Sequence, residues 1–155
     1  MAKTSLYIVV AVVVIVIIVG GVLAYVLTRP SGGGGGNNRD IYASDTPVYG
    51  FGNSAATISS NPGPTMTFTA GQTYTVTLHN VGTTGHNWAI VMTKADGSTD
   101  LAFSGAQIGS ASNPVQPGST GQATFTVGSA GSYYYICQVD GHVSLGMWGK
   151  VTVNP

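Results

Sequence analysis

The hydrophobic positions of the chain follow two different patterns. From Leu6 to Leu27 the sequence is uncharged and consists mostly of Val and Ile. As a helix, these 22 residues would extend about 33 Å, which is sufficient for a bilayer core of about 30 Å. We therefore expect a transmembrane anchor over residues 1–29, with Lys3 and Arg29 at its ends. A cleaved signal peptide with a processing site near Ala24 and a buried core helix are the alternatives.

A glycine-rich stretch follows the apolar run. Gly32 to Gly36 are consecutive glycines, and Asn37 and Asn38 come next. This composition buries little apolar surface and is typical of a flexible tether. We expect a linker over residues 30–41 and a single folded domain over residues 42–155.

The second pattern, in this domain, is the alternation typical of β-strands. Across residues 73–80, Tyr74, Val76 and Leu78 alternate with polar residues and therefore share one face of a strand. The other strand candidates are Thr65–Thr69, Asn87–Thr93, Thr120–Val127, Tyr133–Cys137 and Lys150–Val153. Gly, Pro and Asn clusters separate these short segments, which predicts an all-β fold, a Greek-key β-sandwich preceded by one transmembrane helix. The segment Leu101–Gly118 has no clear alternation, so no strand is assigned to it.

Composition excludes several functions. Charged residues form only 6% of the chain, and five Lys and Arg balance five Asp, whereas an ordinary soluble domain is about 25% charged. A nucleic-acid partner is not expected, because the chain lacks the basic surface that releases counterions. The single cysteine excludes an intramolecular disulfide and a four-cysteine zinc site.

The residues that remain for chemistry are concentrated near the C-terminus. Cys137, His142 and Met147 lie within one short segment, and His86 precedes a predicted strand upstream. A thiolate, an imidazole and a thioether form a soft ligand set, and soft ligands with a second imidazole favour copper in a two-His, one-Cys site with a weak axial Met. His79 competes as the upstream ligand, but its alternation places it opposite the apolar face of its strand.

Other interpretations of these residues are weaker. A catalytic Cys–His pair leaves Met147 unexplained and has only Asn87 as an orienting candidate. A binuclear copper site requires two cysteines in the loop, and a structural zinc site rarely uses Met. Met66 and Met92 are expected to pack in the core. No pattern indicates an enzyme or a small-molecule substrate.

In these four residues the sequence resembles the cupredoxins, which are the small blue (type 1) copper proteins. Within that family it resembles the rusticyanin and sulfocyanin group. Four residues separate Cys137 from His142 and four separate His142 from Met147, which matches the loop of that group. The resemblance implies one copper per chain, held by His86, Cys137 and His142 with Met147 as the axial ligand. It also implies that Asn87 ties the two ligand-bearing segments together, and Trp148 is expected to help exclude water.

The resemblance further implies a carrier of single electrons that cycles between Cu(I) and Cu(II). Its partners would be redox proteins, a cytochrome or a terminal oxidase, docking near His142 on an apolar patch. With the predicted anchor, this gives a cell-membrane protein whose copper domain lies outside the cytoplasm. Beyond Pro30 the chain has three basic residues and five Asp, a net charge of −2, so little repulsion builds up in acid, which suits an acidic exterior. Copper delivery or storage is the alternative function.

Overall fold

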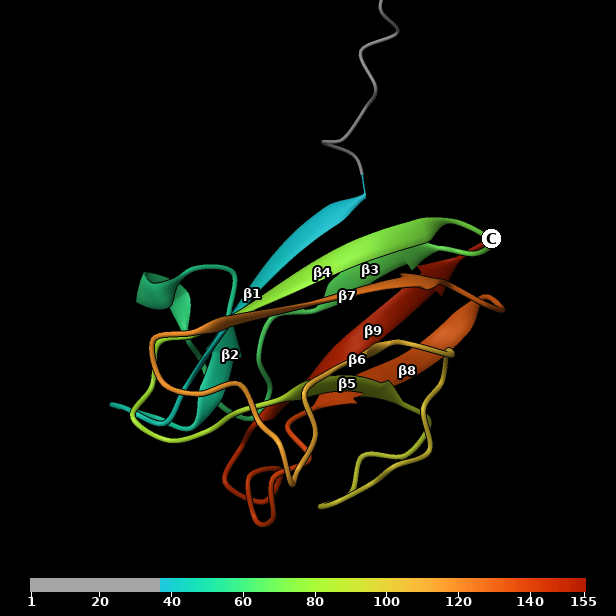
Figure 1. The fold of residues 1–155 in the computed structure, drawn as a ribbon. Coiled ribbons are helices and arrows are strands. Elements are labelled where there is room, and N and C mark those ends of the chain that lie inside the picture. Colours follow the sequence, from blue (N-terminus) through green and yellow to red (C-terminus); the bar gives the residue numbers. More distant parts are fainter. Residues whose placement is uncertain (1–36) are drawn as a thin grey trace, which may run out of the picture. The chain divides into compact units, whose positions relative to one another are not determined.

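The computed structural model describes residues 37–155, which form two β-sheets packed face to face (Figure 1). One sheet has the order β2-β1-β4-β7, with strands at Asn38–Ser44 (β1), Gly50–Gly52 (β2), Thr73–Asn80 (β4) and Thr120–Thr126 (β7). The other has the order β3-β9-β8-β5-β6, with strands at Met66–Thr69 (β3), Trp88–Val91 (β5), Gln107–Ile108 (β6), Gly131–Ile136 (β8) and Trp148–Asn154 (β9). A short 3-10 helix, η1 (Ala55–Thr57), follows β2. The all-β prediction is confirmed.

The alternation along the strands produces the core between the sheets. Tyr74, Val76 and Leu78 of β4 are buried, while the threonines between them are partly exposed. From the facing sheet, Phe68 and Tyr135 join the same cluster of buried side chains. Burial of one apolar face on each sheet is therefore the main interaction that holds the sandwich together.

Strand β5 is buried along its whole length. Trp88 and Ile90 face the main core, whereas Ala89 and Val91 belong to a second cluster with Ile136 of β8. Both faces of β5 are covered, so the strand is continuously apolar instead of alternating.

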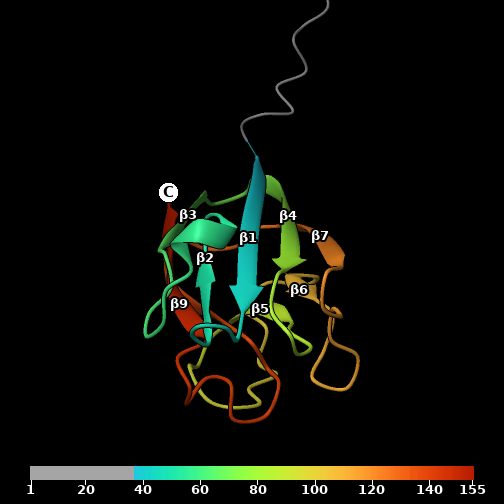
Figure 2. The same cartoon turned by 90° about the vertical axis from the view of Figure 1, so that its left-hand side faces the viewer.

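The first strand was not among the predicted ones. Strand β1 starts at Asn38, inside the range 30–41 that was expected to be linker, and runs parallel to β4 (Figure 2). Ile41 and Ala43 of β1 are fully buried. Strand pairing and packing therefore make residues 38–41 part of the folded domain, although their local composition indicates a linker. The segment Leu101–Gly118, to which no strand was assigned, contains β6, and its Val115 pairs with His86 in an isolated β-bridge.

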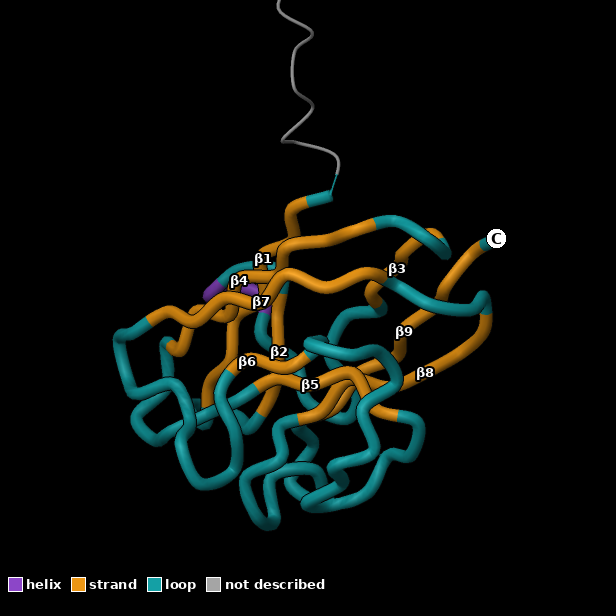
Figure 3. The backbone as a smooth tube through the Cα atoms, turned by 45° about the vertical axis from the view of Figure 1, so that its right-hand side comes forward, coloured by secondary structure: helices purple, strands orange, loops and turns teal. Residues whose placement is uncertain are grey.

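The predicted anchor over residues 1–29 lies outside the described residues. Within residues 37–155, no helix combines the length and apolarity needed to cross a membrane. Most of the irregular backbone gathers at one end of the sandwich (Figure 3). Four of these connections carry the residues of the candidate site: β1–β2, β4–β5, β5–β6 and β8–β9.

Candidate metal centre

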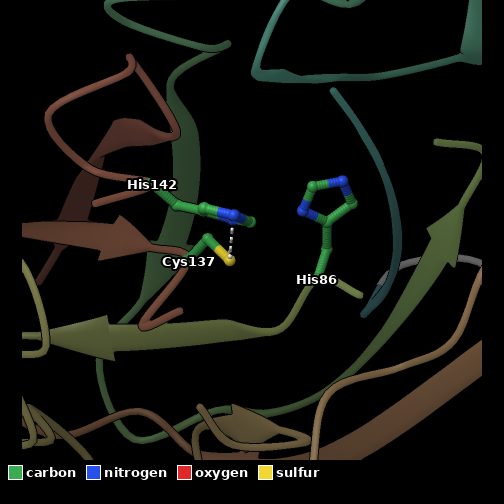
Figure 4. A group of neighbouring side chains, drawn as sticks. All are labelled: His86, Cys137 and His142. Carbon is green, nitrogen blue, oxygen red and sulfur yellow. Dashed lines mark hydrogen bonds between the residues drawn. The ribbon is translucent and has the colours of Figure 1, made fainter. Parts of the chain in front are cut away.

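Three of the predicted ligands meet in the interior of the domain. His86 comes from the β4–β5 connection, and Cys137 and His142 come from the β8–β9 loop (Figure 4). Their candidate ligand atoms all lie within 4.8 Å of one another. His86 and Cys137 are fully buried, and His142 is 8% exposed. A thiol and two imidazoles at this separation can bind one metal ion together.

The backbone of the β8–β9 loop fixes two of these residues relative to each other. The Cys137 N–H donates to the Met147 carbonyl (3.1 Å), which closes the loop at its base. The Met147 N–H donates to the His142 carbonyl (2.9 Å), and a turn at Gly141, with φ of 78°, precedes the second half of the loop. The loop therefore brings Cys137, His142 and Met147 together through main-chain hydrogen bonds.

The fourth predicted ligand, Met147, is placed by the same loop. Its side chain is fully buried and belongs to the cluster that contains Cys137. Its N–H and its carbonyl bond to His142 and Cys137 respectively, so the backbone of Met147 lies beside both of these predicted ligands. A thioether is a weak, soft ligand.

The two imidazoles present different hydrogen-bonding situations. His142 Nδ1 lies 3.3 Å from the Cys137 sulfur. His86 Nδ1 is buried without any hydrogen-bond partner, and its Nε2 lies 3.5 Å from Oδ1 of Asp45. Figure 4 shows one ring nitrogen of His86 facing the other two side chains and the second pointing away from them. A buried polar atom without a partner is costly unless something binds it, so this nitrogen fits a metal ligand.

Asn87 joins the two segments that carry the ligands. Its side-chain oxygen accepts from the Gln138 N–H (2.6 Å), and its side-chain amide donates to Gln138 Oε1 (2.7 Å). Its own N–H points to the Cys137 sulfur at 3.4 Å. His86 is held from the other side, because its backbone pairs with Val115. The spacing of His86 and Cys137 is therefore set by Asn87 and Gln138, the residues that directly follow them, which are buried and hydrogen-bonded to each other.

Burial dominates the electrostatics of the metal-free site. It raises the pKa of the Cys137 thiol to about 11, so the sulfur is protonated at neutral pH. It also lowers the pKa of His86 and of His142 below 6.5, so both rings are neutral near pH 7. Neutral imidazoles are ready to bind a metal, whereas the thiol must first lose its proton.

Three residues of the site were not predicted. Asp45 lies behind His86, and Tyr49 stands edge-on to His142 with 5.1 Å between ring centroids. Asp96 accepts from the Val143 N–H (2.9 Å) and from the Ser144 N–H (3.2 Å), and so holds the turn after His142. Each of these contacts joins segments far apart in the chain, and no local pattern signals them.

The carboxylates beside the loops are stabilised in their charged form. Burial alone would raise the pKa of Asp45, but hydrogen bonds from the Thr83 hydroxyl and N–H, both 2.6 Å, outweigh it and bring the pKa well below its usual value. The hydrogen bond from the Ser144 hydroxyl is the main reason that the pKa of Asp96 lies below its ordinary value. Both groups are therefore negative wherever the fold is intact at neutral or mildly acid pH.

The other predicted residues lie away from the three side chains. His79 pairs with Asp40 (2.7 Å) and stacks on Tyr42, so it belongs to the exposed side of β4. Met66 is buried in the core as expected, whereas the expectation for Met92 is wrong, because it is 57% exposed. Trp148 packs with the second cluster and donates through Nε1 to Asn61 at 3.0 Å.

The fold and the site define a β-sandwich protein with a soft metal centre. Its sequence matches the family of copper binding proteins described as the plastocyanin/azurin family over residues 63–154, and the chain belongs to that family. Copper is accordingly its metal, and the chain carries a His, Cys, His and Met set that suits it.

Two relatives place the chain within this family. It is 36% identical over 104 residues to auracyanin-A of Chloroflexus aurantiacus, covering 57% of this chain and 64% of that protein. It is 32% identical over 108 residues to rusticyanin of Acidithiobacillus ferrooxidans, covering 68% of this chain and 58% of that protein. The matches thus span less than two thirds of either relative. Rusticyanin was expected from the loop spacing, and auracyanin was not.

Solved structures agree with this placement. Reduced auracyanin from Roseiflexus castenholzii superposes with a TM-score of 0.56 at 25% identity, covering 77% of this chain and 98% of that one. Reduced rusticyanin superposes with a TM-score of 0.53 at 28% identity, covering 76% and 78%.

Proposed function

We propose that the protein is a blue copper protein that carries single electrons. The ligands are His86 through Nδ1, Cys137 through its thiolate and His142 through Nδ1, with the Met147 thioether as a weaker axial ligand. The observation that carries the proposal is the convergence of three buried ligand atoms within 4.8 Å, with the Nδ1 of His86 left without a partner inside the protein. Copper bound there supplies the change of one electron between Cu(I) and Cu(II).

The surroundings of the ligands suit electron transfer because they resist movement. The main-chain bonds of the β8–β9 loop and the Asn87–Gln138 pair hold the ligand atoms independently of any metal. A site that keeps one geometry in both oxidation states needs little rearrangement when an electron arrives or leaves. This argues against delivery or storage of copper, because the ligands of a delivery protein must be reached and released, and here they are buried.

Electrons would enter and leave beside His142. This ring is the most exposed of the three clustered groups, at 8%, and Leu145 beside it is 53% exposed. The exposed apolar side chain of Leu145 would contact the redox partner, a protein such as a cytochrome or a terminal oxidase. Trp148, which was expected to help exclude water, has the cation of Lys94 3.8 Å from the centre of its ring.

The site of action is proposed from the sequence. The apolar run Leu6–Leu27 would tether the domain to the cell membrane, and the glycine-rich segment that follows would give it reach on the extracytoplasmic side. The low charge of the domain suits an acidic exterior, and the similarity to rusticyanin is consistent with that setting. Membrane fractionation of the full chain and of a chain lacking residues 1–29 tests the tether. The full chain should stay with the membrane fraction, and finding both chains in the soluble fraction would contradict the tether.

Voltammetry of the copper-loaded protein tests the function. An electron carrier gives a reversible one-electron wave and keeps its copper through repeated cycles. A delivery protein gives up Cu(I) rapidly to a competing chelator and shows no stable wave. Transfer of copper to the chelator within the time of one cycle would overturn the proposal.

A further inference from the structure

A buried carboxylate lies directly behind one of the ligands. Asp45 follows β1, and its side chain is only 6% exposed, against 0% for His86. Its Oδ1 is 3.5 Å from Nε2 of His86, the nitrogen that faces away from Cys137. Asp45 and His86 are 41 positions apart in the chain, so the fold, and not local sequence, creates this contact.

The segment before His86 is built around the carboxylate. The Thr83 N–H donates to Oδ1 and its hydroxyl donates to Oδ2, each at 2.6 Å, and the Thr84 N–H lies 3.4 Å from Oδ1. A Cβ on Gly82 would stand 2.2 Å from Oδ1 of Asp45 and 2.9 Å from Nε2 of His86. Glycine at that position therefore allows the carboxylate to approach the ring, and any side chain there would separate them.

We propose that Asp45 is a positioning residue for the copper centre that also sets its reduction potential. Its carboxylate keeps the His86 proton on Nε2, so that the Nδ1 lone pair faces Cys137 and His142. Its negative charge stabilises the oxidised state over the reduced state, and so lowers the potential. This inference rests on the proposed function, because it assigns a role toward the copper that His86 would bind.

Both effects have a physical basis in the geometry. Imidazoles that bind metals usually donate their other N–H to a carboxylate or carbonyl, which fixes the tautomer and makes the ligand more basic. A fixed charge acts strongly in an interior where the effective dielectric constant is well below that of water. Cu(II) carries one more positive charge than Cu(I), so a nearby anion favours Cu(II).

Asp45→Asn removes the charge and keeps the shape. The amide oxygen can replace Oδ1 as the acceptor for Thr83, Thr84 and His86, while the amide nitrogen can replace Oδ2 because the Thr83 hydroxyl can accept as well as donate. We expect the variant to keep the visible colour of the copper site. We expect the equilibrium constant for its reduction to rise about tenfold, which is 59 mV for one electron.

Asp40→Asn is the matched control. It removes the same charge from a side chain that is 60% exposed and pairs with His79, where solvent screens its effect. Its potential should stay within the error of the wild type. If both variants shift the potential equally, or if Asp45→Asn leaves it unchanged, the inference is wrong.

Nitrogen NMR of the copper-free wild type gives an independent test of the positioning role. We expect His86 at neutral pH to carry its proton on Nε2 and not on Nδ1, and a proton on Nδ1 would overturn the inference even if Asp45→Asn does not fold. Failure of the proposed function gives a different result. A wild type that shows neither blue colour nor a reversible wave would contradict the function as a copper electron carrier. A blue wild type together with an Asp45→Asn variant of unchanged reduction potential would contradict only the role of Asp45.

Discussion

Replacing Asn87 by Ala tests whether the fold itself sets the spacing of the ligands. Asn87 is fully buried and Gln138 is 3% exposed, so water does not reach the groups that the substitution leaves behind. Two hydrogen bonds to Gln138 disappear, one to its N–H at 2.6 Å and one to its Oε1 at 2.7 Å, and the Cys137 thiol loses Oδ1 of Asn87 as its acceptor at 3.5 Å. The bond from the residue 87 N–H to the Cys137 sulfur, at 3.4 Å, is kept because it uses the backbone.

The size of the effect follows from the two groups of Gln138 left without partners. Each buried polar group without a partner costs about 1–3 kcal/mol. The Gln138 side chain can turn to relieve part of this cost, because its amide nitrogen is anchored only to the Ser98 carbonyl. We therefore expect the free energy of unfolding of the copper-free protein to fall by about 2–4 kcal/mol. Copper should also dissociate faster, because His86 and Cys137 are no longer tied together.

Urea unfolding of the copper-free wild type and variant measures the first effect, and transfer of copper to a chelator measures the second. Gln122→Ala is the control, since it removes one exposed hydrogen bond to Thr77 (3.1 Å) far from the ligands and should cost no more than about 0.5 kcal/mol. A loss in Asn87→Ala that equals the control would refute the reasoning, because the two buried bonds would then contribute nothing.

Three further predictions concern protons and the loop. Copper binding at pH 7 should release about one proton per chain, because the Cys137 thiol, with its pKa of about 11, is protonated before copper binds. Calorimetry in buffers of different ionisation enthalpy measures this number, and release of no proton would contradict the burial of a protonated thiol. The pKa values of His86 and His142 are lowered by burial from 6.5, so the unfolded chain binds their protons first and copper-free stability should fall as pH drops below 6.5. The loaded protein, whose imidazoles are occupied, should lose less stability between pH 7 and pH 5, and equal slopes in urea unfolding would disprove this. Asp96→Ala removes the acceptor of the Val143 and Ser144 N–H groups and should destabilise the fold by about 1 kcal/mol, given the exposure of Asp96. It should also speed copper loss, because Asp96 holds the turn after His142; an unchanged rate of copper loss would count against its role.

Local patterns predicted the strands that bury one face or lie continuously in the core. Strand β4 coincides with the predicted segment 73–80, because alternation and burial agree there residue by residue. Strands β2 and β6 have three and two residues, too few for any period to be recognised. Strand β1 was missed because its first residues continue a glycine- and asparagine-rich segment, and only pairing with β4 makes it a strand.

The same distinction applies to the candidate site. Cys137, His142 and Met147 share one loop, so spacing alone brought them together, and His86 could be proposed from its chemistry and its place before a strand. Asp45 could not be found this way, because its partners lie in the β4–β5 connection and its role depends on the space left by Gly82. Contacts between distant segments are set by the tertiary fold and leave no periodic signal in the sequence.

The visible spectrum of the copper-loaded protein tests the central claim most directly. A thiolate bound to Cu(II) in a site of this kind absorbs intensely in the visible range, so the wild type should become blue as one copper per chain is added. Cys137→Ala should abolish that absorption, while His79→Ala, which changes a histidine paired with Asp40 away from the site, should keep it. A spectrum unchanged by Cys137→Ala, or a wild type that binds Cu(II) without intense colour, would contradict the account.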